Sequence, residues 1–82
     1  HEADRYSELK LLQATGEIRD LELQPAYELA VAGRVIGKYI ADFRYMENGR
    51  VVVEDAKGVR TDVYRLKKKM VEAIYGIKIV EV

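Results

Sequence analysis

The dipeptide Asn48-Gly49 constrains the fold of this chain more than any other feature. It separates two runs, residues 34–46 and 50–57, that are rich in Val, Ile, Tyr and Phe and are therefore typical of β-strands. Asn-Gly is the strongest short-range signal for a two-residue hairpin turn, because both residues tolerate a positive φ. We therefore predict an antiparallel hairpin in which residue 47 faces residue 50 and residue 42 faces residue 55.

Helical periodicity is found on both sides of this hairpin. Residues 2–15 carry apolar side chains at helical spacing, and Gly16 stands where a C-terminal cap belongs. A second helix is predicted from the N-cap Thr61 to Tyr75, with Gly76 as its stop. The apolar stripe expected on this second helix consists of Val63, Leu66, Met70 and Ile74.

Residues 18–32 and 77–82 have extended patterns and complete the list of elements. The chain order is then helix, three strands in a meander, helix and strand. Because the second helix is a crossover, the final strand is predicted to run parallel to the third strand. The sequence predicts an α+β fold in which a mixed four-stranded sheet is flanked by two helices.

Composition limits the classes of protein that this chain can represent. Its 82 residues balance 14 Lys+Arg against 14 Asp+Glu and include no cysteine, which excludes a disulfide framework and a thiolate metal site. The lack of cysteine fits a reducing cytoplasm, where we expect the protein to be found. No apolar run approaches the ~20 residues that cross a bilayer, so we expect no membrane partner. We expect one domain over residues 1–82, with a core small enough to favour a homodimer, and a natural chain that extends beyond the first helix at its N-terminus.

Basic side chains concentrate in residues 57–69, although the chain as a whole is neutral. The only acidic residue of this stretch is Asp62. A compact basic stretch of this kind is a plausible contact for a phosphate backbone. A solvated helix face is the alternative, and for a charge run alone it is the more frequent explanation.

The hairpin register also places Asp42 opposite Asp55, as a closely spaced non-hydrogen-bonded pair. Two carboxylates in this position repel each other, unless one is protonated, a cation lies between them or the register is different. A divalent cation would turn the repulsion into a chelate. Strand alternation places Lys57 on the face of Asp55 and Glu54 on the opposite face. Two carboxylates and an amine suit metal-assisted phosphodiester hydrolysis, and a surface Asp–Lys cluster is the alternative.

The order of elements and the pattern Asp42…Asp55-Ala56-Lys57 resemble the PD-(D/E)XK nuclease superfamily. Further strings resemble one member of it, a small phage- and prophage-associated family known as a domain of unknown function. These strings agree in order and spacing over nearly the whole chain: Glu2-Ala3-Asp4-Arg5-Tyr6, Gly16-Glu17-Ile18, Leu23-Gln24-Pro25, Ala41-Asp42-Phe43-Arg44-Tyr45 and Glu54-Asp55-Ala56-Lys57-Gly58.

This resemblance implies an αβββαβ restriction-endonuclease-like core and a nuclease that hydrolyses DNA with Mg²⁺ or Mn²⁺, in a bacterial or phage-infected host cell. Asp42 and Asp55 match the two acidic positions of the motif, and Lys57 matches its lysine. Glu2 matches an acid that superfamily members often add from the first helix, as a weaker metal ligand. The second acid is Asp where Glu is commoner, which shortens the reach to a metal by one methylene.

The basic stretch and two polar residues complete the candidate site. The residues expected to contact DNA are Arg60, Tyr64, Arg65, Lys67 and Lys68. Gln24 and Thr61 are accessory candidates, with backbone capping as the alternative for each. The alternative function is a non-catalytic nucleic-acid-binding or assembly module on the same fold. A purely structural subunit would leave the two aspartates unexplained. Calcium binding without catalysis is a further alternative, but Lys57 beside the two carboxylates would make them a poor calcium site.

Overall fold

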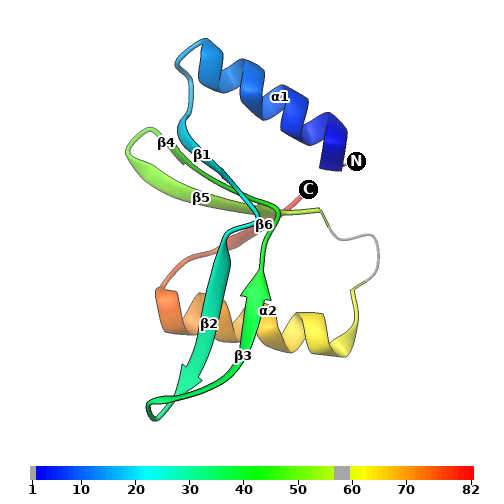
Figure 1. Cartoon of the computed structure of the whole chain (residues 1–82), viewed down its shortest axis with the longest axis vertical. Helices are drawn as coiled ribbons and strands as arrows, with labels where there is room; N and C mark the ends of the chain where they lie inside the picture. The colour runs from blue at the N-terminus through cyan, green and yellow to red at the C-terminus, as the bar shows by residue number, and fades with distance from the viewer. Residues whose placement is uncertain (1, 57–59) are drawn as a thin grey trace.

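The computed structural model describes residues 2–56 and 60–82 of the chain. In chain order the elements are α1 (Glu2–Ala14), β1 (Arg19–Leu23), β2 (Ala26–Val31), β3 (Arg34–Ile40), β4 (Phe43–Glu47), β5 (Arg50–Asp55), α2 (Asp62–Tyr75) and β6 (Ile79–Glu81) (Figure 1).

The predicted α+β fold with a mixed four-stranded sheet is confirmed. The strand order of this sheet is β1-β4-β5-β6. The pairs β1–β4 and β4–β5 are antiparallel, whereas β5 and β6 are parallel. The crossover through α2 therefore delivers the last strand in the predicted direction.

The predicted hairpin register is confirmed as well. Glu47 pairs with Arg50, and the ladder continues without a shift to the pair of Phe43 and Glu54. Asn48 and Gly49 both have positive φ, of 53° and 76°. This is the geometry that makes Asn-Gly a strong turn signal.

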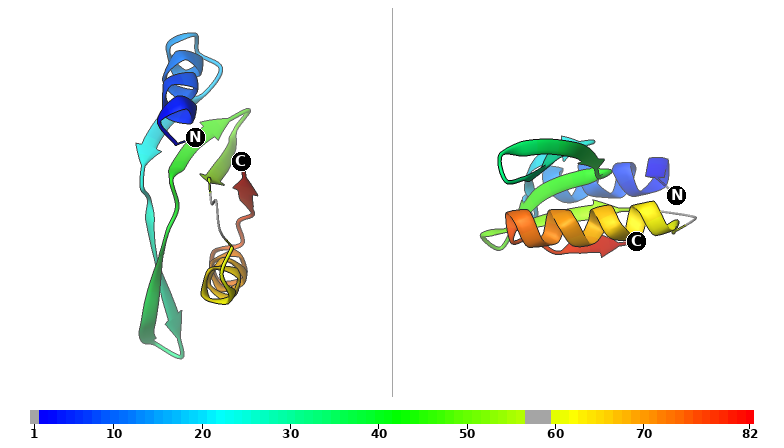
Figure 2. Two further views of the ribbon diagram at one scale, coloured as in Figure 1. Left: turned by 90° about the vertical axis from the view of Figure 1, so that its right-hand side faces the viewer. Right: turned by 90° about the horizontal axis from the view of Figure 1, so that it is seen from below.

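The two longest predicted strands are each broken in the structure. The strand expected over residues 18–32 divides into β1 and β2, and that expected over 34–46 divides into β3 and β4. The strands β2 and β3 pair with each other as a separate two-stranded sheet. This second hairpin extends away from the four-stranded sheet and lies beside α2 (Figures 1 and 2).

The two breaks lie next to each other in the fold, at residues 24–25 and 41–42. Gln24 has a φ of 50°, outside the strand region, and Pro25 after it has no amide hydrogen to donate. Two hydrogen bonds join the segment at Gln24-Pro25 to the segment at Ala41-Asp42. The Gln24 amide donates to the Asp42 carbonyl at 2.8 Å, and the Ala41 amide donates to the Pro25 carbonyl at 3.1 Å. The two segments therefore bend together, just after β1 and just before β4.

The bend divides the core into two clusters. One cluster packs under α1 and contains Leu9, Ile18, Phe43 and Tyr45. The other joins the β2–β3 hairpin, α2 and the end of the sheet, and consists of Tyr27, Leu29, Tyr39, Ala41, Val53, Tyr64, Val71 and Ile79.

Helix α2 has the predicted caps, but its buried face is rotated from the predicted stripe, of which Met70 still packs against the core. The Thr61 side chain accepts from the Tyr64 amide, and Gly76 ends the helix in the left-handed region. Val63 and Leu66 of the predicted stripe are 63% and 60% exposed, and the helix buries Tyr64 and Val71. The bent hairpin packs against the side of Tyr64, about 100° round the helix from Val63. Within the described residues, neither helix is long and apolar enough to span a membrane.

Candidate active site

Asp42 and Asp55 lie side by side where the β4–β5 ladder ends. The last regular pair is Phe43 and Glu54, and each aspartate directly adjoins one of these two residues in the chain. The Asp42 amide donates to the Glu54 carbonyl at 3.1 Å. The Ala56 amide donates to Asp42 Oδ2 at 2.7 Å, so the carboxylate of Asp42 reaches the peptide that follows Asp55. Asp42 is 9% exposed and Asp55 is fully buried.

Tyr39 of β3 fixes the orientation of Asp55. Its hydroxyl donates a hydrogen bond to Asp55 Oδ2, and the ring packs 6.2 Å from that of Tyr64. Burial, reinforced by the hydrogen bond to Asp55, raises the pKa of Tyr39 far above its ordinary value. The hydroxyl therefore keeps its proton and stays a donor. Sequence reasoning missed Tyr39, because this contact forms only when the hairpin bends after β3.

Glu54 lies on the opposite face of β5, as strand alternation predicts. Arg5 of α1 donates from Nε to Oε1 at 2.8 Å and from Nη2 to Oε2 at 2.6 Å, and the Tyr45 hydroxyl also donates to Oε2. Burial alone would raise the pKa of Glu54, but the hydrogen bonds from Arg5 and Tyr45 hold it below its usual range. This ionised carboxylate fixes α1 to the sheet, and no local sequence signal links Arg5 to it.

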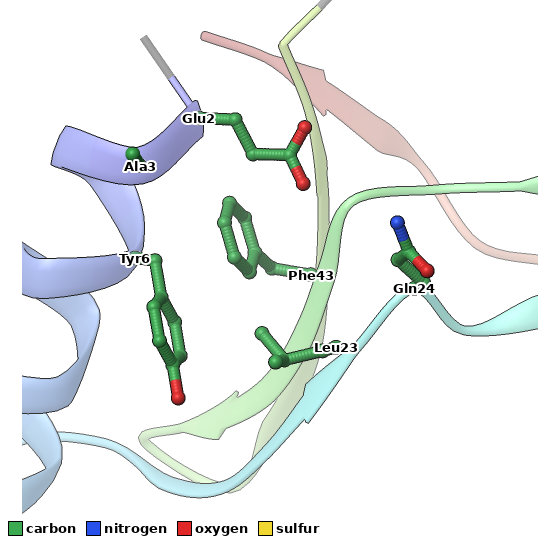
Figure 3. A pocket seen from close by; sticks show the side chains of 6 residues that line it. All are labelled: Glu2, Ala3, Tyr6, Leu23, Gln24 and Phe43. Carbon is green, nitrogen blue, oxygen red and sulfur yellow. The ribbon is translucent and has the colours of Figure 1, made fainter.

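Glu2 and Gln24 line a common pocket. This pocket has a volume of about 630 Å³ and is lined by Glu2, Ala3, Tyr6, Leu23, Gln24 and Phe43. Figure 3 shows the Glu2 carboxylate and the Gln24 amide on either side of the Phe43 ring. The exposed Glu2 carboxylate therefore lies at the rim of this pocket, across the Phe43 ring from Gln24.

The residues present suit Mg²⁺, which needs few protein ligands, better than a metal ion whose ligands all come from the protein. Within residues 2–56 and 60–82, no group of three or more His, Asp or Glu side chains gathers to hold an ion. Mg²⁺ is usually held by one or two carboxylates, together with water and substrate phosphate oxygens. The pair of Asp42 and Asp55 meets that requirement. Lys57, the third residue of the predicted motif, lies outside the described residues.

Three predicted DNA contacts converge on a single carboxylate, Glu81 of β6. Arg60 Nε donates to Glu81 Oε2 at 3.0 Å, and the Tyr64 hydroxyl donates to the same atom at 2.7 Å. Lys68 Nζ lies 3.7 Å from Glu81 Oε1. Burial and the hydrogen bond to Glu81 raise the pKa of Tyr64 to about 12. A fourth predicted contact, Arg65, is exposed and pairs with Asp62 at 3.2 Å.

The fifth predicted contact, Lys67, turns towards the β2–β3 hairpin. Its Cε lies 4.0 Å from where a Cβ on Gly37 would stand. Lys67 lines a pocket of about 310 Å³ together with Lys38, Thr61 and the two tyrosines Tyr39 and Tyr64. Two lysines from separate elements therefore meet beside the start of α2. Sequence reasoning missed Lys38, because only the bend brings β3 against this helix.

The chain was compared with known proteins. A family model described as "Protein of unknown function (DUF1064)" matches residues 1–80, which is almost all of the chain. No curated protein and no solved structure matches it. The family description names no activity, so a function has to be argued from the geometry above. By the extent of the match, the chain belongs to the DUF1064 family.

Proposed function

We propose that this protein is a metal-dependent nuclease that hydrolyses phosphodiester bonds in DNA. The observation that carries the proposal is the pair of buried aspartates at the end of the β4–β5 ladder. Burying a carboxylate is costly unless its charge is compensated, and a second carboxylate beside it adds repulsion. A cation bound beside the two acids is one arrangement that makes such a pair favourable. A divalent cation compensates both charges at once.

The residues around the pair support this assignment. The Ala56 amide and the Tyr39 hydroxyl each hold an Oδ2 atom, so the two carboxylates have fixed orientations before any ion arrives. Mg²⁺ or Mn²⁺, when bound, would supply Lewis-acid activation of a phosphoryl oxygen and of a water molecule. Lys57 matches the lysine of the nuclease motif, and we assign it the positioning of the attacking water.

Lys38 and Lys67 are the cations best placed to receive the DNA backbone. They line one pocket with Tyr39, which is hydrogen-bonded to Asp55. A phosphate held between them would therefore be near the aspartate pair. The resemblance to a phage- and prophage-associated family supports DNA as the nucleic acid.

A gel assay on single-stranded, duplex and branched DNA tests the proposal. We expect cleavage with Mg²⁺ or Mn²⁺ and none with EDTA. Asp42→Asn should reduce the rate by about 100-fold or more, because it removes one of two ligand charges. Asp20→Asn is the matched control, since it removes the same charge from β1 near the opposite end of β4.

Two results would contradict the proposal. The first is cleavage by Asp42→Asn at the wild-type rate. The second is tight DNA binding by the wild-type protein with no cleavage under any metal condition. In that second case a non-catalytic binding module on the same fold would replace the nuclease.

A further inference from the structure

The pocket under the start of α1 has features that phosphodiester chemistry alone does not require. Its volume of about 630 Å³ lies within the range of small-molecule sites. Phe43 closes its floor and is buried, while Tyr6 is half-buried and Leu23 is half-exposed. The rings of Tyr6 and Phe43 are parallel within 4°, with centroids 6.3 Å apart. The pocket is therefore an apolar recess with aromatic groups in a single orientation.

Two polar groups stand at the rim of this recess. Both the Glu2 carboxylate and the Gln24 amide are exposed and lie on either side of the Phe43 ring (Figure 3). A carboxylate accepts hydrogen bonds, whereas an amide both donates and accepts them. Apolar walls with a few convergent polar groups are the usual composition of a site for a flat heteroaromatic ligand.

The recess adjoins the candidate catalytic pair through the backbone. Phe43 directly follows Asp42 in the chain, and the backbone N–H of Gln24 donates to the Asp42 carbonyl at 2.8 Å. The N-terminal ends of α1 and α2 lie on the same side of the molecule (Figures 1 and 2). The recess at the start of α1 and the lysine-lined pocket at the start of α2 therefore lie on the same side of the molecule.

We propose that this recess binds one unpaired nucleobase of the DNA, and prefers a base that carries an amino group. The inference rests on the proposed function, because it names the part of the substrate that lies beside the aspartate pair. A base inside a duplex is stacked and cannot enter such a recess, so the substrate is single-stranded or has an unpaired nucleotide there.

The charge of the rim selects the base over the phosphate. The Glu2 carboxylate repels a phosphate group, but it accepts hydrogen bonds from the amino groups of guanine, adenine and cytosine. Thymine has no amino group and loses this contact. Tyr6 and Leu23 offer apolar surface to the base, and Gln24 can bond to its edge.

The test measures binding with EDTA present, so that no strand is cut. The probe is a fluorescent single-stranded oligonucleotide, compared with the same strand in which every base has been removed. Stacking of a base on an aromatic side chain changes affinity by about five- to 150-fold per base. We expect the wild-type protein to bind the base-containing strand at least about fivefold more tightly, and oligo-dC more tightly than oligo-dT.

Three variants assign the effect to the recess. Ala3→Phe fills it from an exposed position of the first helical turn and should remove the advantage of bases over abasic sites. Glu2→Gln should reduce the preference for oligo-dC over oligo-dT, whereas the relief of phosphate repulsion should strengthen the binding of both strands and of the abasic strand equally. Asp4→Asn, an exposed neighbour on α1, removes the same charge and should change neither comparison.

The outcomes separate the two proposals. Equal binding of base-containing and abasic strands by the wild-type protein overturns the base site, whether or not DNA is cleaved. Base-dependent binding that Ala3→Phe leaves intact overturns it as well, because the base then binds elsewhere. Base-dependent binding lost in Ala3→Phe, from a protein that never cleaves DNA, supports the recess and contradicts the nuclease.

Discussion

Glu54 and Asp55 are consecutive residues of β5, and both are buried carboxylates, yet their surroundings differ completely. Glu54 faces α1, where the Arg5 guanidinium binds it through two nitrogens and the Tyr45 hydroxyl adds a third donor. Asp55 faces the other way, where the Tyr39 hydroxyl donates a hydrogen bond to it, and Asp42 lies at the same end of the β4–β5 ladder. On one face of β5, Glu54 is surrounded by cationic and polar donors. On the other face, Asp55 and Asp42 lie together.

This difference separates a structural carboxylate from a candidate catalytic one. A bidentate guanidinium compensates the charge of Glu54 inside the folded chain and fixes a helix in place. Two neighbouring aspartates place two acidic groups where a divalent cation could bind. The predictions below test whether the two faces divide stability and chemistry in this way.

The largest expected effect is on cleavage. Asp55→Asn should lower the cleavage rate by about 100-fold or more, because it removes a metal-ligand charge. Glu54→Gln should leave the rate per folded molecule largely intact, because this side chain faces α1. Single-turnover cleavage at low temperature, corrected for the folded fraction by circular dichroism, checks both variants. If Glu54→Gln were inactive and Asp55→Asn active, Glu54 would be the catalytic carboxylate, and the assignment would be wrong.

The next effect is on stability and concerns the opposite face. Arg5→Ala leaves the buried Glu54 carboxylate without its cation and should lower the free energy of unfolding by about 3 kcal/mol. This is the lower end of the range for a broken buried pair, because the Arg5 side chain is 26% exposed. Urea denaturation in EDTA measures it, with Arg19→Ala on β1 as the control. Asp42→Asn should leave the unfolding free energy unchanged or raise it, since it relieves repulsion.

The sequence predicted those features that depend on local signals, namely the hairpin register, the two faces of β5 and the ends of α2. The Asn48-Gly49 turn determined the register, and alternation along β5 then placed Glu54 and Asp55 on opposite faces. The capping residues Thr61 and Gly76 likewise marked both ends of α2. Each of these signals lies within a few residues of the feature that it determines.

The rest depended on the bend before β4, which has only weak sequence signals. Pro25 indicated an interruption, but nothing local showed that Gln24 would adopt a positive φ. The bend brings Tyr39 to Asp55 and Lys38 to Lys67, and it turns the buried face of α2 from Val63 to Tyr64. These partners are distant in sequence, so their contacts require the packed structure.

The structural face should also give a distinct response to acid. The pKa of Glu54 is lowered on folding, so its ion pair stabilises the protein above the ordinary value of 4.5 and is lost as the pH falls below it. The difference in unfolding free energy between wild type and Glu54→Gln should be constant above about pH 5 and shrink below it. Urea titrations from pH 7 to pH 3 measure this, with the exposed Glu17→Gln as the control. A difference that grows towards acid pH would contradict the assignment.

The smallest expected effect tests the same distinction among the cations. Lys68 lies beside Glu81, whereas Lys38 and Lys67 form no ion pair with another described residue and line one pocket. Lys38→Ala and Lys67→Ala should each reduce the slope of log affinity against log salt by about one, for any DNA sequence, because phosphate contacts carry no base information. Lys68→Ala should reduce it less, and the exposed Lys69→Ala least of all. Filter binding from 50 to about 200 mM salt resolves such changes. If Lys68→Ala lowered the slope more than Lys67→Ala, DNA would compete with Glu81 for its cations, and the backbone would lie along β6 instead of the hairpin.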